Sequence, residues 1–336
     1  MVNIKDLVAT ANALVAKKEG ILAADESTGT ITKRFSAVNI QCTEESRRDY
    51  REMLFRTKGV SEFISGVILY DETIRQKGVD GTPLLSILQE ARIIPGIKVD
   101  KGTKLLVGTK NELVTEGLDG LRERCKEYYQ MGARFTKWRA VFSIGEGTPS
   151  DYCINVNAHT LARYARLSQE VELVPIIEPE VLMNGNHSID DCFAATERTL
   201  REVFYQMSKQ GVMLEGCLIK PNMILSGKES ANRSSQAEVG QKTVACLMRT
   251  VPSAVPGIVF LSGGQGDEES VSNLHAINLE GAKIGVPWEM SFSYGRGLQA
   301  TPLKIWAGKF INVLEAQKAF YQRCLVTSQA RSGSYK

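Results

Sequence analysis

Eight short apolar runs, rich in β-branched residues, recur at nearly even intervals along the 336-residue chain. Their first residues lie about 38 positions apart on average, which suits one strand, one loop and one helix per interval. No linker rich in glycine, serine or proline divides them. This repetition predicts an α/β fold, a closed (β/α)8 TIM barrel of eight parallel strands, rather than an open doubly wound sheet. The runs are 20–26, 65–73, 93–100, 133–144, 172–182, 215–224, 257–264 and 288–299.

Helical patterns fill the intervals between these runs. The clearest covers residues 188–210, where apolar residues at helical spacing form one face. Ser188 and Asp191 match a capping box at its start. Thr43 and Asp119 are candidate N-caps of two further helices.

The ends of the chain add two elements to the barrel. Residues 1–18 have an amphipathic pattern, which predicts an extra N-terminal helix. We expect one barrel domain over residues 1–336, with a short C-terminal tail from about residue 326. Residues 225–241, rich in Ser, Lys, Asn and Arg, predict a polar loop or flap.

Composition excludes several classes of function. A net charge of +3, without a long Lys/Arg run, disfavours a nucleic-acid partner. The longest apolar stretches fall far short of the ~18 residues of a membrane span, and residues 1–18 lack an apolar signal core, so we expect a cytoplasmic protein without a membrane partner. Seven scattered cysteines and three histidines lack zinc-site spacing, which predicts reduced thiols and no metal.

Charged residues close six of the eight runs. In a barrel, the carboxyl ends of the strands carry the chemistry. Strand alternation puts Lys137 and Arg139 on one face, and Glu178 and Glu180 likewise share a face. A single charged residue at a strand end is as often part of a structural salt bridge at the barrel rim as it is functional. Charged residues at six strand ends need either oppositely charged partners or an anionic ligand. The six runs end in or carry Asp25 with Glu26, Lys98, Lys137 with Arg139, Glu178 with Glu180, Lys220, and Arg296.

Two glycine-containing segments lie in the last parts of the last two runs, where barrels commonly hold phosphate. They contribute Ser262, Gly263 and Gly264 in one loop, and Ser293, Gly295 and Arg296 in the other. Residues 295–300 also fit the dinucleotide pattern G-x-G-x-x-A. Only 36 residues follow Ala300, too few for the rest of a nucleotide-binding domain, so we expect no nicotinamide cofactor.

Lys220 is the candidate nucleophile. An ordinary lysine, with a pKa of about 10.4, is neutral in only about one part in a few thousand at pH 7. Burial beside the cations Lys137 and Arg139 would lower its pKa by about three units. Glu178 and Asp25 would then divide the proton transfers, and this scheme requires no metal and no cofactor.

Six segments together resemble class I fructose-bisphosphate aldolase, and the resemblance runs almost from end to end of the chain. They are residues 20–29 (GILAADESTG), 96–102 (GIKVDKG), 136–139 (TKWR), 178–180 (EPE), 218–223 (LIKPNM) and 260–265 (FLSGGQ). The resemblance implies a lyase of glycolysis and gluconeogenesis, which reversibly cleaves fructose 1,6-bisphosphate to dihydroxyacetone phosphate and glyceraldehyde 3-phosphate. It also implies a cytoplasmic homotetramer, and some members bind cytoskeletal filaments such as actin.

Carried over by position, the resemblance implies that Lys220 forms the Schiff base, Glu178 acts as acid and base, and Asp25 handles the substrate hydroxyl. Lys137 would assist them, and Glu180 would hold neighbouring lysines in place. One phosphate would lie among Ser262, Gly263, Gly264, Ser293, Gly295 and Arg296. The other would lie toward Ser27, Lys33, Arg34, Lys98 and Arg139.

Two alternatives and one departure from the family accompany this interpretation. A weakly catalytic scaffold and a Schiff-base aldolase or transaldolase for another phosphorylated ketose, such as the monophosphate, remain open. The family's C-terminal tail ends in a tyrosine that reaches the active site, whereas Tyr335 is penultimate here and the tail is about 20 residues shorter by this comparison. We therefore expect normal cleavage but slower proton exchange on the enamine.

Overall fold

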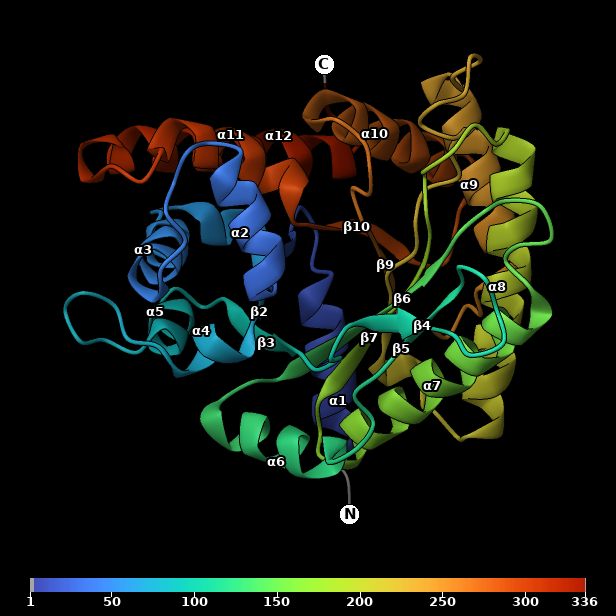
Figure 1. Ribbon diagram of the computed structural model, residues 1–336, viewed down its shortest axis with the longest axis horizontal. Coiled ribbons are helices and arrows are strands. Elements are labelled where there is room, and N and C mark those ends of the chain that lie inside the picture. The colour runs from blue at the N-terminus through green and yellow to red at the C-terminus, as the bar shows by residue number, and fades with distance from the viewer. Residues whose placement is uncertain (1–2, 336) are drawn as a thin grey trace.

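The strands form one closed barrel, surrounded by helices, in a computed structural model that describes residues 3–335 (Figure 1). Around the barrel the order is β1-β10-β9-β8-β7-β6-β3-β2, and each neighbouring pair is parallel. The predicted fold class is confirmed, and each predicted run overlaps one barrel strand, although the strands are shorter than the runs. The strands are β1 (Gly20–Ala24), β2 (Ile64–Leu69), β3 (Ile94–Lys98), β6 (Phe135–Phe142), β7 (Val174–Val181), β8 (Leu218–Ile219), β9 (Gly257–Phe260) and β10 (Glu289–Tyr294).

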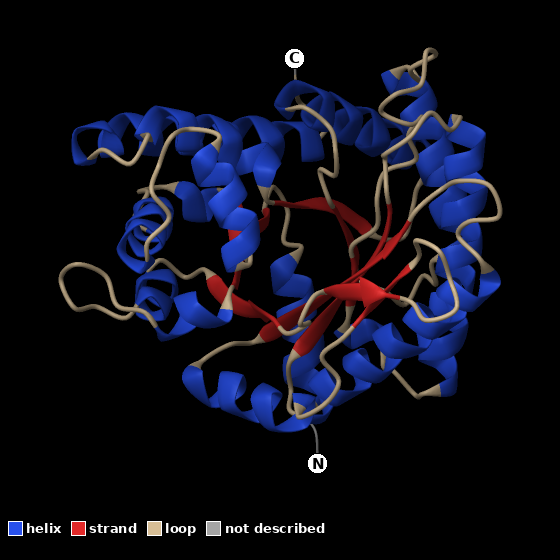
Figure 2. Ribbon diagram, viewed as in Figure 1, coloured by secondary structure: helices blue, strands red, loops and turns tan. Residues whose placement is uncertain are grey.

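Helices form the outer layer around the strands (Figure 2). They cover the outward-facing side chains, so most barrel strands are apolar on both faces and read as continuous hydrophobic runs. The helices are α1 (Ile4–Leu14), α2 (Thr28–Ser36), α3 (Glu44–Phe55), α4 (Asp71–Arg75), α5 (Leu84–Glu90), α6 (Leu121–Met131), α7 (Asp151–Glu170), α8 (Ile189–Lys209), α9 (Gln236–Thr250), α10 (Asp267–Ile284), α11 (Arg296–Trp306) and α12 (Val313–Arg331), with 3-10 turns η1 (Val60–Glu62), η2 (Leu214–Gly216) and η3 (Phe310–Asn312).

The predicted N-terminal helix, α1, closes the amino-terminal end of the barrel. Leu7, Ala11 and Leu14 are buried on its inner face, and they pack against a cluster of strand residues that includes Ile21 and Phe135. This apolar seal leaves the carboxyl ends of the strands as the accessible end of the barrel. Within residues 3–335, none of the helices combines the length and apolar character needed to span a bilayer.

Helix starts follow the predicted capping residues in two of three cases. Ser188 accepts from Asp191 N, and the Asp191 side chain accepts from Ser188 N, which completes the capping box of α8. Thr43 caps α3 in the same reciprocal way with Ser46. The Asp119 prediction is wrong, because Gly120, in a left-handed conformation with φ of 65°, is the N-cap of α6.

Two boundaries and one additional element also differ from expectation. The predicted polar loop 225–241 ends at Ser235, whose side chain caps α9. The expected tail from residue 326 is helical as far as Arg331, because the Arg331 guanidinium is held by the carbonyls of Val15 and Ala16. A small antiparallel hairpin of β4 (Thr103–Leu105) and β5 (Leu113–Thr115) was not predicted.

Candidate active site

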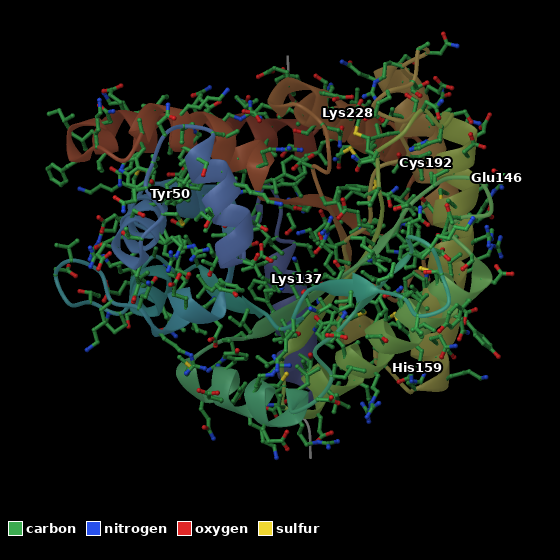
Figure 3. The ribbon with its side chains drawn as sticks, viewed as in Figure 1. Tyr50, Lys137, Glu146, His159, Cys192 and Lys228 are labelled. Atoms are coloured by element: carbon green, nitrogen blue, oxygen red, sulfur yellow. The ribbon has the colours of Figure 1, made fainter. Side chains whose placement is uncertain are left out.

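Four charged side chains meet inside the carboxyl-terminal end of the barrel. Lys137 belongs to β6 and Glu178 to β7, while Asp25 and Lys220 directly follow β1 and β8. Each is at most 9% exposed. Figure 3 labels Lys137 near the centre of the view, on the ribbon of β6. The structure therefore brings together four of the charged residues that the sequence places at strand ends.

Their charged groups form one ion-pair chain. Lys137 Nζ lies 2.7 Å from Asp25 Oδ2 and 2.9 Å from Glu178 Oε2. Lys220 Nζ lies 3.3 Å from Glu178 Oε1. Glu178 thus bridges the two lysines, and two cations balance two anions in a volume where an unpaired charge would be costly.

The two buried lysines have opposite pKa shifts. Burial lowers the pKa of Lys220, and the charge of Lys137 lowers it further against the opposing charges of Glu178 and Asp25. Burial would also lower the pKa of Lys137, but Asp25 and Glu178 more than compensate and raise it. Lys137 therefore stays a cation, whereas Lys220 is the amine with easier access to its neutral, nucleophilic form.

The carboxyl groups are stabilised as anions. Burial tends to raise the pKa of Asp25 and of Glu178, but in both groups the charges of Lys137 and Lys220 outweigh burial and lower the pKa. Each is a carboxylate at neutral pH and can accept a proton. Glu178 is the one in contact with Lys220.

The lowered pKa of Lys220 predicts its reactivity. Reductive methylation with formaldehyde and cyanoborohydride attacks the neutral amine, so the half-maximal rate at Lys220 is expected at a lower pH than at surface lysines. Mass spectrometry of the same digest at several pH values compares these lysines within one sample. An equal or higher midpoint at Lys220 would contradict the assigned shift.

Arg139 does not act on Lys220 as expected. Its Nε lies 2.5 Å from Glu180 Oε2, and Glu180 thereby holds an arginine rather than a neighbouring lysine. The groups that perturb the pKa of Lys220 are Glu178, Lys137 and Asp25, after burial. The lowered pKa of Lys220 is thus explained by burial and one cationic neighbour, Lys137, and not by two cations as predicted.

A polar cleft of about 630 Å³ opens at the same end of the barrel. None of the four charged residues lines it, and Lys98 in its wall is the residue whose charge acts on Asp25. The cleft wall includes Ser27, Lys98 and Arg139, three of the five residues expected toward the second phosphate. Lys33 is exposed on α2 and does not line the cleft. Such a concentration of cations and a hydroxyl suits an anionic group.

Arg34 lies elsewhere. It forms an ion pair with Glu26, and its Nη2 is 3.7 Å from the point where a Cβ on Gly295 would be. Arg34 is therefore beside the β10–α11 connection rather than in the cleft wall.

The two predicted phosphate loops lie next to each other. Arg296 Nη2 donates to Gly263 O at 2.6 Å, which ties the loop after β10 to the loop after β9. Gly297 lies so close to Ser262 that a Cβ would approach the Ser262 Cβ at 3.2 Å. Here α11 begins at Arg296, and its first backbone N–H groups add a favourable potential for an anion.

Sequence reasoning gave no role to two buried carboxylates of this end of the barrel. Asp100 pairs with Lys98, and Glu26 accepts from Gln299 and pairs with Arg34. Asp100 lies two positions after Lys98, at the end of a predicted run, and this spacing could have indicated that the two side chains pair. Gln299 follows Glu26 by 273 residues, a pairing with no local signal.

Tyr335 packs on the outside of α10. Its hydroxyl donates to Glu268 Oε2 at 3.1 Å, and its ring meets His275 edge-on.

Three comparisons with known proteins agree with one another. The family model described as fructose-bisphosphate aldolase class-I matches residues 6–336. A "Probable fructose-bisphosphate aldolase class 1" of Xanthomonas campestris is 52% identical over 99% of both chains, and "Fructose-bisphosphate aldolase 6, cytosolic" of Arabidopsis thaliana is 52% identical over 98% of this chain and 92% of that one. A crystal structure of Plasmodium falciparum fructose-bisphosphate aldolase, in complex with TRAP and a small-molecule inhibitor, superposes with a TM-score of 0.97 at 50% identity, covering 99% and 95% of the two chains.

Proposed function

Because the chain belongs to the class-I fructose-bisphosphate aldolase family, we propose that it cleaves fructose 1,6-bisphosphate through a Schiff base on Lys220. The products are dihydroxyacetone phosphate and glyceraldehyde 3-phosphate. The observation that carries the assignment is the asymmetry between two buried lysines, of which only Lys220 has a lowered pKa. Its contact with the Glu178 carboxylate supplies the proton acceptor that amine addition needs.

The steps follow from these contacts. Neutral Lys220 adds to the substrate ketone, and Glu178 moves the protons that convert the carbinolamine into an iminium with loss of water. Asp25 accepts the proton of the C4 hydroxyl, the C3–C4 bond breaks, and its electron pair passes to the iminium nitrogen. Glyceraldehyde 3-phosphate leaves, and protonation of the enamine and hydrolysis release dihydroxyacetone phosphate and restore Lys220.

Lys137 stabilises this arrangement as a permanent cation between Asp25 and Glu178. Its charge keeps both carboxyls ionised before reaction, so each is ready to accept a proton. The loops around Ser262 and Arg296 are the proposed site of one phosphate. The cleft around Lys98 and Arg139 is the proposed site of the other.

The function is tested by coupled assay of both triose phosphates, with fructose 1,6-bisphosphate as substrate and with excess chelator. We expect turnover that the chelator does not reduce. The absence of turnover in folded protein would overturn the proposal and favour the scaffold alternative.

The two phosphate sites predict different effects of two substitutions. Lys98→Met is expected to raise the KM for the bisphosphate about ten-fold or more and to change the KM for fructose 1-phosphate little, because the monophosphate lacks the group in the cleft. Ser262→Ala is the matched comparison and should raise both KM values similarly. Equal effects of Lys98→Met on both substrates would favour a monophosphate-directed enzyme.

Location and assembly extend the proposal. The Arabidopsis relative is named cytosolic, which supports a cytoplasmic location for this chain. We propose that it is a cytoplasmic homotetramer that also binds cytoskeletal filaments such as actin. Light scattering should give about four times the 37.0 kDa chain mass, and a monomer mass would contradict the tetramer.

A further inference from the structure

Three carboxylates, Asp71, Asp100 and Glu127, line the cleft that we assign to a phosphate, and Asp100 is the buried one. It follows β3, and its side chain is 3% exposed. A buried carboxylate beside a phosphate repels it, so electrostatics alone would exclude an aspartate here. Its hydrogen bonds explain its presence.

Both carboxylate oxygens of Asp100 hold parts of the cleft. Oδ1 accepts from Lys98 Nζ at 2.6 Å and from Gly102 N at 3.1 Å. Oδ2 accepts from Arg139 N on β6 at 3.3 Å. The Lys98 ammonium also donates to the Asp100 carbonyl at 2.9 Å, so two of its three donors are fixed and one is left for a ligand.

We propose that Asp100 is a positioning residue that fixes Lys98 relative to the Arg139 strand and thereby sets the preference for a bisphosphate over a monophosphate. The proposal rests on the proposed function. It adds that the specificity of the cleft depends on an anion that itself contacts no phosphate. β3 and β6 are neighbours in the barrel, so Asp100 links the backbones that carry the two cations.

Asn is the informative replacement. It has nearly the same shape, but it loses the charge and presents an NH2 group where one carboxylate oxygen now accepts. It cannot accept from Arg139 N while also accepting from Gly102 N and Lys98 as Asp100 does. In either orientation of the amide one link breaks, either the one to Arg139 N or the one to Lys98 and Gly102, so Lys98 is no longer fixed relative to the strand that carries Arg139.

The two interpretations of Asp100 predict opposite signs. If Asp100 only balances charge, Asp100→Asn makes the cleft more positive and lowers the KM for fructose 1,6-bisphosphate. If Asp100 positions Lys98, the bisphosphate KM rises, about ten-fold or more, while kcat/KM for fructose 1-phosphate stays within about two-fold. The unchanged monophosphate reaction also reports that the variant is folded.

The experiment measures kcat and KM for both substrates in wild type, Asp100→Asn, Lys98→Met and the double variant. Because Asp100 acts through Lys98, the double variant should match Lys98→Met rather than combine both losses. Asp80→Asn is the matched control: Asp80 also accepts from the N–H two residues on, Thr82, and pairs with a cation, Arg56, but lies outside the cleft. It should leave both substrates unaffected.

An unchanged or lower bisphosphate KM in Asp100→Asn would overturn the positioning role, as would equal losses on both substrates or additive losses in the double variant. Wild-type protein that cleaves neither sugar phosphate would instead overturn the proposed function itself. The two failures are therefore distinguishable within one set of measurements.

Discussion

Lys220→Met is expected to lower the kcat for fructose 1,6-bisphosphate cleavage by at least about 10⁴-fold. Removal of the amine eliminates the covalent intermediate, and no other group in the chain of charges can replace it, because Lys137 is held as a cation by Asp25 and Glu178. The fold should survive, since Glu178 keeps its ion pair with Lys137 when Lys220 is lost. Circular dichroism checks the fold, and the coupled assay gives the rate.

Lys228→Met is the matched control for this loss. Lys228 is an exposed lysine eight residues further on, in the loop before α9, and Figure 3 labels it in the upper part of the view, away from Lys137. The control should keep wild-type activity. If Lys220→Met retained more than a few per cent of the wild-type rate, the nucleophile would be another lysine, with Lys137 the first to test.

Lys137→Met is expected to destabilise the protein by about 3–5 kcal/mol at pH 7. Asp25 and Glu178 would stay buried with only Lys220 to compensate two carboxylates. Cleavage should fall as well, because the residues that exchange protons lose the charge that keeps them ionised. Denaturant unfolding at matched protein concentrations measures the difference from wild type.

The pH dependence identifies the cause of this loss. In wild type the pKa values of Asp25 and Glu178 are lowered, so their stabilising contribution is present above the ordinary carboxyl pKa of about 4 and is lost as pH falls through the folded values. Without Lys137, burial raises these pKa values relative to wild type. The stability gap between wild type and Lys137→Met should therefore be largest near neutral pH and shrink on acidification.

Lys137→Arg, which keeps the charge, should recover part of the stability. A gap that is small at pH 7, or constant between pH 7 and pH 4, would show that Lys137 does not compensate the two carboxylates.

The barrel was predictable from sequence because parallel strands buried on both faces appear as continuous apolar runs. The end of α12 was not, because its buried residues include Arg323, Thr327 and Arg331, whose side chains bond to carbonyls remote in sequence or one turn back. The buried positions of this last part of α12 are mostly polar, so no apolar stripe marks the end of the helix. The β4–β5 hairpin has three residues per strand, too few to form a recognisable alternation.

The same limit applies to the site. Alternation correctly placed Lys137 and Arg139 on one face, with Trp138 stacked on Tyr164 on the other. Alternation did not predict with which carboxylate each cation forms an ion pair, because this pairing depends on the register of neighbouring strands. Arg139 stands opposite Glu178 in that register and pairs with Glu180, whereas Lys137 reaches both Asp25 and Glu178.

The central claim is that Lys220 forms a covalent imine with the substrate, and borohydride reduction in the presence of fructose 1,6-bisphosphate tests it most directly. Peptide mass mapping, with and without chelator, locates the reduced adduct. We predict one chelator-insensitive adduct, on the peptide that contains Lys220. No adduct in folded protein, or an adduct on Lys137 in place of Lys220, would contradict the account.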